Sequence, residues 1–128
     1  MQVKVHPEAL SQALLEIEGG LSALPEDRRL KALLICEEIV TNQLRHADFE
    51  GRIPEISVQI SMEKNEKIRL LFQDNGALFN PLQASDPDLS TELQDCTPGG
   101  LGIYLVKQSA ETIRYSYEDE HSILEVTL

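Results

Sequence analysis

The sequence predicts an α+β fold, a two-layer α/β sandwich in which helices cover one face of a mostly antiparallel sheet. Several short segments alternate apolar and polar residues, which is typical of strands with one buried face. Other, longer segments repeat their apolar residues every three or four positions, which is typical of helices. Most of the strand segments occur as neighbouring pairs joined by a short polar turn, and such pairs form antiparallel hairpins.

The first third of the chain is predicted to form one strand and two helices. Residues 2–6 alternate like a strand, and Pro7 suits the first turn of a helix that the glycines at 19–20 stop. A second helix starts at Pro25 and runs to about Ala47. It carries apolar residues on nearly all sides, so we expect it to be buried on most sides. These residues are Leu30, Leu33, Leu34, Ile35, Ile39, Val40 and Leu44.

The rest of the chain is predicted to form two hairpins separated by a long loop and a third helix. Residues 55–74 form the first hairpin around a polar turn at 63–66, and residues 112–128 form the second. Residues 75–98 lack periodicity and are rich in proline and aspartate, and a helix follows from about Leu101 to Glu111. Loops longer than about 12 to 15 residues are uncommon in compact domains and often act as lids.

Composition limits the classes of function. The 128 residues fit a single domain over 1–128. Lys and Arg number 11 against 22 Asp and Glu, and the resulting net charge of -11 opposes binding to nucleic acid. No apolar run approaches the ~20 residues of a membrane span, and the N-terminus does not resemble a secretory signal. We therefore expect a cytoplasmic protein without a nucleic-acid or membrane partner. Cys36 and Cys96 have no metal-binding spacing and are expected to be reduced thiols.

A polar stripe interrupts the second predicted helix. Glu38 and Asn42 are four residues apart, and Arg45 lies seven residues from Glu38, so the three side chains project from nearly one line. In one interpretation they face solvent and Arg45 screens Glu38. In the other they converge on a cleft, where Glu38 accepts a proton, the Asn42 amide oxygen ligates Mg²⁺ and Arg45 contacts a phosphate.

The segment Asp74-Asn75-Gly76 follows a predicted strand. It is a turn signal, and Asp74 has the position to cap its own loop. The turn also opens the long loop, where a carboxylate that only accepts hydrogen bonds would select a ring with an exocyclic amine, as in adenine. A guanine carbonyl at that place would leave an unpaired acceptor at a cost of about 1–3 kcal/mol.

A glycine cluster precedes the third predicted helix. Gly99, Gly100 and Gly102 allow close approach of a ligand to the backbone, and the helix directs its free amide groups toward an anion such as phosphate. The alternative is a hinge with tight packing under the helix. The pattern is neither the P-loop nor the dinucleotide-binding fingerprint.

Three segments in this order resemble a known superfamily. They are EEIVTNQLRHA (37–47), FQDNGALFNP (72–81) and GGLGIYLVKQSAETIRY (99–115). Together they resemble the N, G1 and G2 boxes of the Bergerat-fold ATPases, which include gyrase, histidine kinases and anti-sigma factors. The chain looks most like the branch of anti-sigma-factor serine/threonine-protein kinases.

The resemblance implies ATP and Mg²⁺ as cofactors. In the N box, Asn42 would hold Mg²⁺, Glu38 would be the catalytic base and Arg45 would contact phosphate. His46 also matches the N box, and we expect a structural, hydrogen-bonded role for it.

The other two boxes would bind the nucleotide. By the same resemblance, Asp74 would bind the adenine amine and Gly76 would keep the turn open. Gly99, Gly100 and Gly102 would face the phosphates.

The chain departs from the pattern of this branch in its loop. The resemblance makes residues 75–98 an ATP lid, and related lids often carry a basic residue before the glycines, where this chain has Asp95, Cys96 and Thr97. The pair Ala77-Leu78 replaces a smaller, glycine-containing turn.

The resemblance implies a kinase that phosphorylates a small anti-sigma-factor antagonist and alternately binds a sigma factor or similar regulator, with a homodimer as a possible assembly. One alternative is a non-catalytic nucleotide-binding partner-switch module of the same fold, which the missing lid base favours. A catalytic domain of a two-component histidine kinase is a third, weaker alternative.

Overall fold

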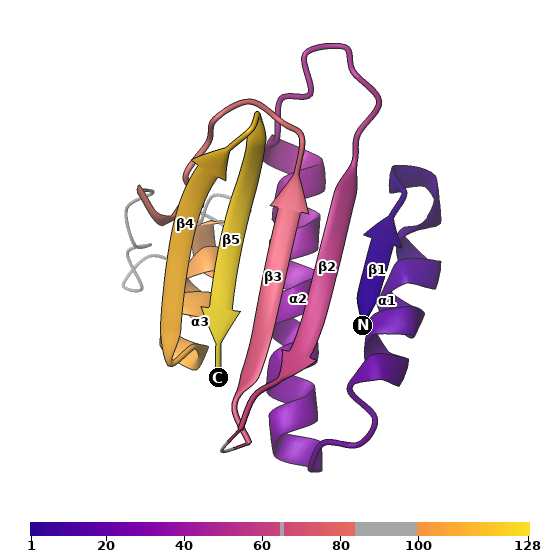
Figure 1. Ribbon diagram of the computed structural model, residues 1–128, viewed down its shortest axis with the longest axis vertical. Coiled ribbons are helices and arrows are strands. Elements are labelled where there is room, and N and C mark those ends of the chain that lie inside the picture. Colours follow the sequence, from indigo (N-terminus) through magenta and orange to yellow (C-terminus); the bar gives the residue numbers. More distant parts are fainter. Residues whose placement is uncertain (65, 84–99) are drawn as a thin grey trace.

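The computed structural model describes residues 1–64, 66–83 and 100–128, and its strands form one sheet (Figure 1). The sheet has five strands in the order β1-β2-β3-β5-β4, and every neighbouring pair is antiparallel. The strands are β1 (Gln2–Val5), β2 (Ile56–Met62), β3 (Ile68–Asp74), β4 (Thr112–Glu118) and β5 (His121–Thr127). The helices are α1 (Leu10–Gly20), α2 (Glu26–His46) and α3 (Gly100–Ser109), with short 3₁₀ turns η1 (Pro7–Ala9) and η2 (Pro81–Gln83). The predicted α+β class is confirmed.

The helices form a second layer over one face of the sheet. In Figure 1, α2 lies behind the centre of the sheet, α3 behind β4 and β5, and α1 beside β1. Residues of β3 and β5 alternate between buried and half-buried positions, so the face toward the helices is the apolar one. The largest fully buried side chains come from both layers. They include Ile17, Ile35, Ile39, Val40, Val58, Ile68, Leu70, Phe72 and Val106.

Apart from the start of the first helix, the predicted boundaries agree with the structure to within about two residues. The chain after Pro7 first forms the 3₁₀ turn η1, and the glycines at 19–20 are the last residues of α1. The third helix ends earlier than expected, at Ser109. Its continuation to Glu111 is prevented because the Glu111 amide donates to the Thr127 carbonyl (2.8 Å) and so starts the pairing of β4 with β5.

The expectation that α2 is buried on most sides is wrong. Its buried residues form one face, toward the sheet: Ala32, Ile35, Cys36, Ile39, Val40 and Gln43. Leu30 is 54% exposed and Leu34 is 39% exposed. In a two-layer fold the outer face of the central helix has no further layer of described residues over it, so apolar side chains there meet solvent.

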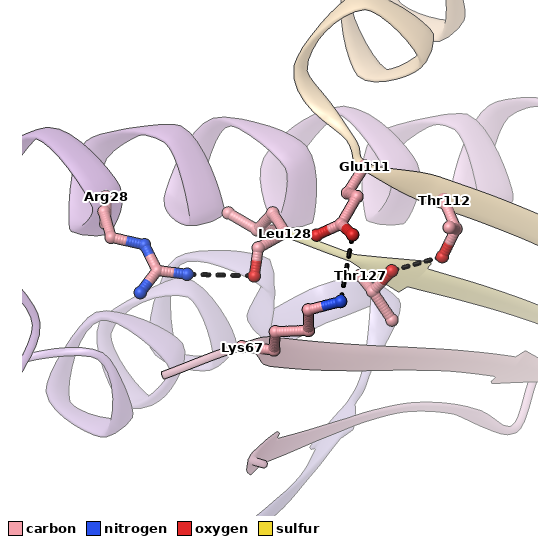
Figure 2. Close-up of polar contacts among 6 residues, drawn as sticks. All are labelled: Arg28, Lys67, Glu111, Thr112, Thr127 and Leu128. Atoms are coloured by element: carbon pink, nitrogen blue, oxygen red, sulfur yellow. Dashed lines mark hydrogen bonds and ion pairs between the residues drawn. The ribbon is translucent and has the colours of Figure 1, made fainter. Parts of the chain in front are cut away.

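Polar contacts join several elements at the end of the sheet where β5 finishes (Figure 2). Arg28 at the start of α2 donates to the Leu128 carbonyl (2.9 Å), and Lys67 forms an ion pair with Glu111 (3.0 Å). The hydroxyls of Thr112 and Thr127 form a hydrogen bond across β4 and β5. These contacts connect α2, β3, β4 and β5, at the end of the sheet opposite Asp74.

Within residues 1–64, 66–83 and 100–128, no helix combines the length and the hydrophobicity that crossing a membrane requires.

The turn between β4 and β5 generates a stability prediction. Asp119 and Glu120 have φ of 50° and 61°, as in the tight hairpin turn that prefers Asp-Gly. Glycine has no side chain to disfavour positive φ, so Glu120→Gly is expected to raise the free energy of unfolding by about 0.5–1 kcal/mol in urea titrations. Glu118→Gly, the same exchange inside β4, is the control and should lower it. A lower stability of Glu120→Gly would contradict this account of the turn.

Cys36 makes the stability depend on pH. Burial raises the pKa of its thiol from 9.0 to about 12. The unfolded chain releases this proton near pH 9 while the folded protein keeps it, so the contribution is present below pH 9 and is lost as the pH rises toward 12. The difference in free energy of unfolding between Cys36→Val and the wild type should therefore shift by about 2 kcal/mol in favour of the variant between pH 8 and pH 10.5. Unfolding curves with the same difference at both pH values would contradict the prediction.

Candidate functional site

Glu38 and Gly102 come together where the middle of α2 meets the first turn of α3. A Cβ atom added to Gly102 would lie 3.2 Å from the Glu38 Cδ and would overlap the carboxylate oxygen Oε2. Glu38 is half-buried. A carboxylate at a helix N-terminus is stabilised by the free amide groups and by the helix dipole. The structure thus brings a residue of the predicted N box against one of the predicted glycines.

The three residues of the predicted polar stripe differ in their surroundings. Asn42 is half-buried and lines a cavity beside Asp74. Arg45 and His46 are exposed, in the last turn of α2. His46 makes no side-chain hydrogen bond to any described residue, so these residues do not support the structural role expected for it. The phosphate contact of Arg45 stays a prediction.

Asp74 ends β3 and is buried, with 6% of its surface exposed. Gln43 Nε2 donates to its Oδ2 (3.0 Å), and the Gly76 amide donates to its Oδ1 (2.9 Å). The bond from Gly76 is the loop cap that the turn signal predicts. The carboxylate is therefore held in one orientation by two donors, and each oxygen retains a further lone pair.

There is no room for a side chain at Gly76, and this lack of space, not the backbone angles, accounts for the glycine. A Cβ at this position would lie 2.9 Å from Asp74 Oδ1 and 3.1 Å from the Ala47 Cβ. A larger residue would push the carboxylate or the end of α2 aside. The predicted role of Gly76 in keeping the turn open for a nucleotide stays a prediction.

Gln43 is a site residue that the sequence analysis missed. Its side chain is 9% exposed, it lines the cavity, and its carbonyl oxygen Oε1 has no hydrogen-bond partner among the described residues. A glutamine among apolar residues on the buried face of α2, one position after Asn42, was the available signal. Buried polar groups usually have partners, so this one requires an explanation.

Asn75 was also missed, and it anchors the turn. Its Oδ1 accepts from the Glu55 amide (2.8 Å), and its Nδ2 donates to the Ile53 carbonyl (3.0 Å). The Ala77 amide donates to the Asp48 carbonyl (2.7 Å). The segments before β2 and after α2 are thus tied to the turn that carries Asp74.

The cavity lies between α2, the ends of β3 and β5, and the start of the long loop. Its walls include Phe72, Asp74, Phe79, Tyr115 and Leu124, and its volume is about 30 Å³. This is room for one or two water molecules. The loop after Asp74 forms one wall of this cavity through Ala77, Phe79 and Pro81. That loop is held by a hydrogen bond from the Phe79 amide to the Tyr115 hydroxyl (3.2 Å).

The donor set fits a magnesium nucleotide. The described residues contain no group of three or more His, Cys, Asp or Glu placed to bind a metal ion by itself. Mg²⁺ in nucleotide sites is usually held by few protein oxygens together with the phosphates, and the Asn42 amide oxygen fits that role. The buried, unpaired Gln43 Oε1 fits a ligand that donates hydrogen bonds.

Some predicted site features lie outside the described residues. These are Gly99, the lid from 84 to 98 and, within it, Asp95, Cys96 and Thr97. Gly100 begins α3. The role of the lid and of these residues stays a prediction.

The fold and the site define a class of protein. A family model described as a histidine kinase-like ATPase domain matches residues 3–128. The chain belongs to this family of ATPases, as the resemblance of its three boxes predicted.

The chain is also similar to individual proteins. The chain is 30% identical over 99 residues to the serine/threonine-protein kinase BtrW of Bordetella bronchiseptica, covering 77% of this chain and 69% of that protein. In fold it is similar to the histidine kinase domain of the blue-light activated histidine kinase of Erythrobacter litoralis EL346 (TM-score 0.63, 14% identity, 95% of this chain). A second structure of that kinase gives a TM-score of 0.58 at 15% identity over 91% of this chain. The chain spans 59% and 40% of the lengths of these two structures.

The contact between Glu38 and Gly102 can be tested by mutation. Gly102→Ala is expected to lower the free energy of unfolding by about 0.3–1 kcal/mol, because the added methyl group pushes the flexible Glu38 carboxylate away from the helix N-terminus that stabilises it. The double variant with Glu38→Ala should recover most of this loss, since the Glu38 Cβ lies 3.8 Å away, at ordinary contact distance.

Gly19→Ala is the matched control, because it adds the same methyl group to a helix with nothing within 4 Å. It should be neutral or stabilising in the same urea titrations. Additive effects of Gly102→Ala and Glu38→Ala would show that the two residues are not in contact.

Proposed function

We propose that the chain is an ATP- and Mg²⁺-dependent serine/threonine-protein kinase that acts as an anti-sigma factor. It phosphorylates a small antagonist protein and alternately binds a sigma factor or a similar regulator. The observation that carries the proposal is the meeting of Glu38 with Gly102 at the start of α3, with Asn42 about one turn further along α2. The identity of 30% with a serine/threonine-protein kinase supports the activity.

Different residues bind the two ends of the nucleotide. Asp74 accepts a hydrogen bond from the adenine amine, and the first turn of α3 with its glycines receives the phosphates. Asn42 provides an oxygen ligand to Mg²⁺. The bound nucleotide supplies the γ-phosphoryl group, and the contribution of the protein to such a transfer is mainly positioning and neutralisation of charge.

Glu38 is the proposed general base. Its carboxylate lies against the first turn of α3, next to the proposed phosphate site, where it would accept the proton of the attacking Ser or Thr hydroxyl. Positioned general bases contribute about 10²–10⁴-fold to rates. The net charge of -11 favours protein partners with basic surfaces, and Arg45 would offset part of the repulsion of ATP.

Transfer and binding can be separated with three variants. With radiolabelled ATP, Mg²⁺ and an extract of the source cells, the wild type is expected to label a small protein on Ser or Thr, shown by acid-stable phosphoamino acids. Glu38→Gln should reduce the labelling about 10²–10⁴-fold, while ATP affinity in calorimetry changes less than threefold. Asn42→Ala should remove the dependence of ATP affinity on Mg²⁺.

Glu37→Gln is the matched control, because Glu37 is exposed and adjacent to Glu38 in the sequence but points away from the buried face of α2. It should label like the wild type. Acid-labile label on histidine would contradict the proposed specificity. Binding of ATP without any transfer would instead favour the non-catalytic partner-switch module.

A further inference from the structure

Gln43 has an unexplained acceptor inside the candidate nucleotide site. Its side chain is buried, it lines the same cavity as Asp74, and its Oε1 has no partner among the described residues. The neighbouring side chains in this cavity are mainly apolar, among them Ile39, Phe72 and Leu124. No described residue donates to this acceptor, so its partner must be whatever occupies the cavity, either water or a ligand.

The orientation of the Gln43 amide follows from its partner. The Asp74 carboxylate only accepts hydrogen bonds, so the Gln43 group that faces its Oδ2 at 3.0 Å must be the amide nitrogen. Rotating the amide by 180° would place two acceptors against each other. The orphaned atom is therefore the oxygen, and no exchange of the two amide atoms removes it.

Gln43 Oε1 and the Asp74 carboxylate have a spacing that suits one amine. The oxygen and nitrogen of an amide are about 2.3 Å apart, so a straight hydrogen bond from the N–H on the same side as Oε1 places Oε1 roughly 4 Å from Asp74 Oδ2. One amine nitrogen on the side away from Gln43 Nε2 can then donate to both acceptors at ordinary length, whereas at a spacing of about 5 Å it would collide with Nε2. Asp74 alone would receive one of the two N–H groups of such an amine.

We infer that Gln43 is a specificity-determining residue of the nucleotide site, which accepts the second N–H of the exocyclic amine while Asp74 accepts the first. The inference rests on the proposed nucleotide binding and adds Gln43 as a second residue that recognises the amine. Gln43 also positions Asp74 through its amide nitrogen. A nucleotide with a ring carbonyl in place of the amine would put its carbonyl oxygen, an acceptor, against Gln43 Oε1 and the Asp74 carboxylate, which are also acceptors.

Calorimetry with nucleotide analogues tests the inference. The ligands are ATP, N6-methyl-ATP, which has one N–H, and purine riboside triphosphate, which has no amine. We expect the wild type to prefer ATP over N6-methyl-ATP by about 10- to 100-fold, since a missing donor leaves a buried acceptor unpaired. In Gln43→Met, which keeps the length of the side chain but removes both polar atoms, the preference should fall to less than threefold.

Two further measurements separate specificity from structure. Gln59→Met makes the same exchange at an exposed position of β2 and should leave the preference unchanged. Thermal unfolding without nucleotide gives a readout independent of ligand binding. Removal of the orphaned oxygen offsets the loss of the bond to Asp74, so the melting temperature of Gln43→Met should stay within a few degrees of the wild type.

The possible results distinguish this inference from the proposed function. If the wild type binds ATP but Gln43→Met keeps the full preference for ATP over N6-methyl-ATP, Gln43 does not read the amine and the inference is overturned. A preference for ATP over purine riboside triphosphate that survives in Gln43→Met would then belong to Asp74. If the wild type does not bind ATP, the proposed function itself fails, and this inference fails with it.

Discussion

Burial of one face of α2 against the sheet is the constraint on which the rest of the structure depends. Ile35, Ile39 and Val40 have at most 2% of their surface exposed, and they fix both the rotation of the helix and its position along the sheet. With that rotation set, Glu38 reaches α3, and Gln43 reaches the end of β3. The apolar packing that stabilises the fold therefore also places the polar residues of the site.

Contacts from several elements hold the candidate site in place. Asp74 is held by donors from α2 and from its own turn, and Asn75 ties that turn to the segment before β2. The cavity beside it is small, and the loop that follows is attached to β4 by the bond between Phe79 and Tyr115. The carboxylate proposed to accept the adenine amine is therefore preorganised, which lowers the cost of binding.

Much of the fold was predictable, because its signals are local. Alternation identified all five strands, and apolar periodicity with Pro25 and the glycines at 19–20 identified the helices. The exposure of Leu30 and Leu34 was not predictable, because a helix with apolar residues all round does not show how many layers will cover it. Gln43 was missed for a related reason: its polarity acquires a meaning only beside Asp74, 31 residues later in the chain.

The sequence by itself determined the α+β class, the order of elements, the family and the identity of Glu38, Asn42, Asp74 and Gly102 as candidate site residues. Only the tertiary structure decided which of these residues meet. It placed Glu38 against Gly102, joined Gln43 to Asp74 and left Arg45 exposed. The physical reason is that periodicity and turn chemistry act over a few residues. Contacts between α2, β3 and α3 depend instead on how whole faces pack, which no short segment specifies.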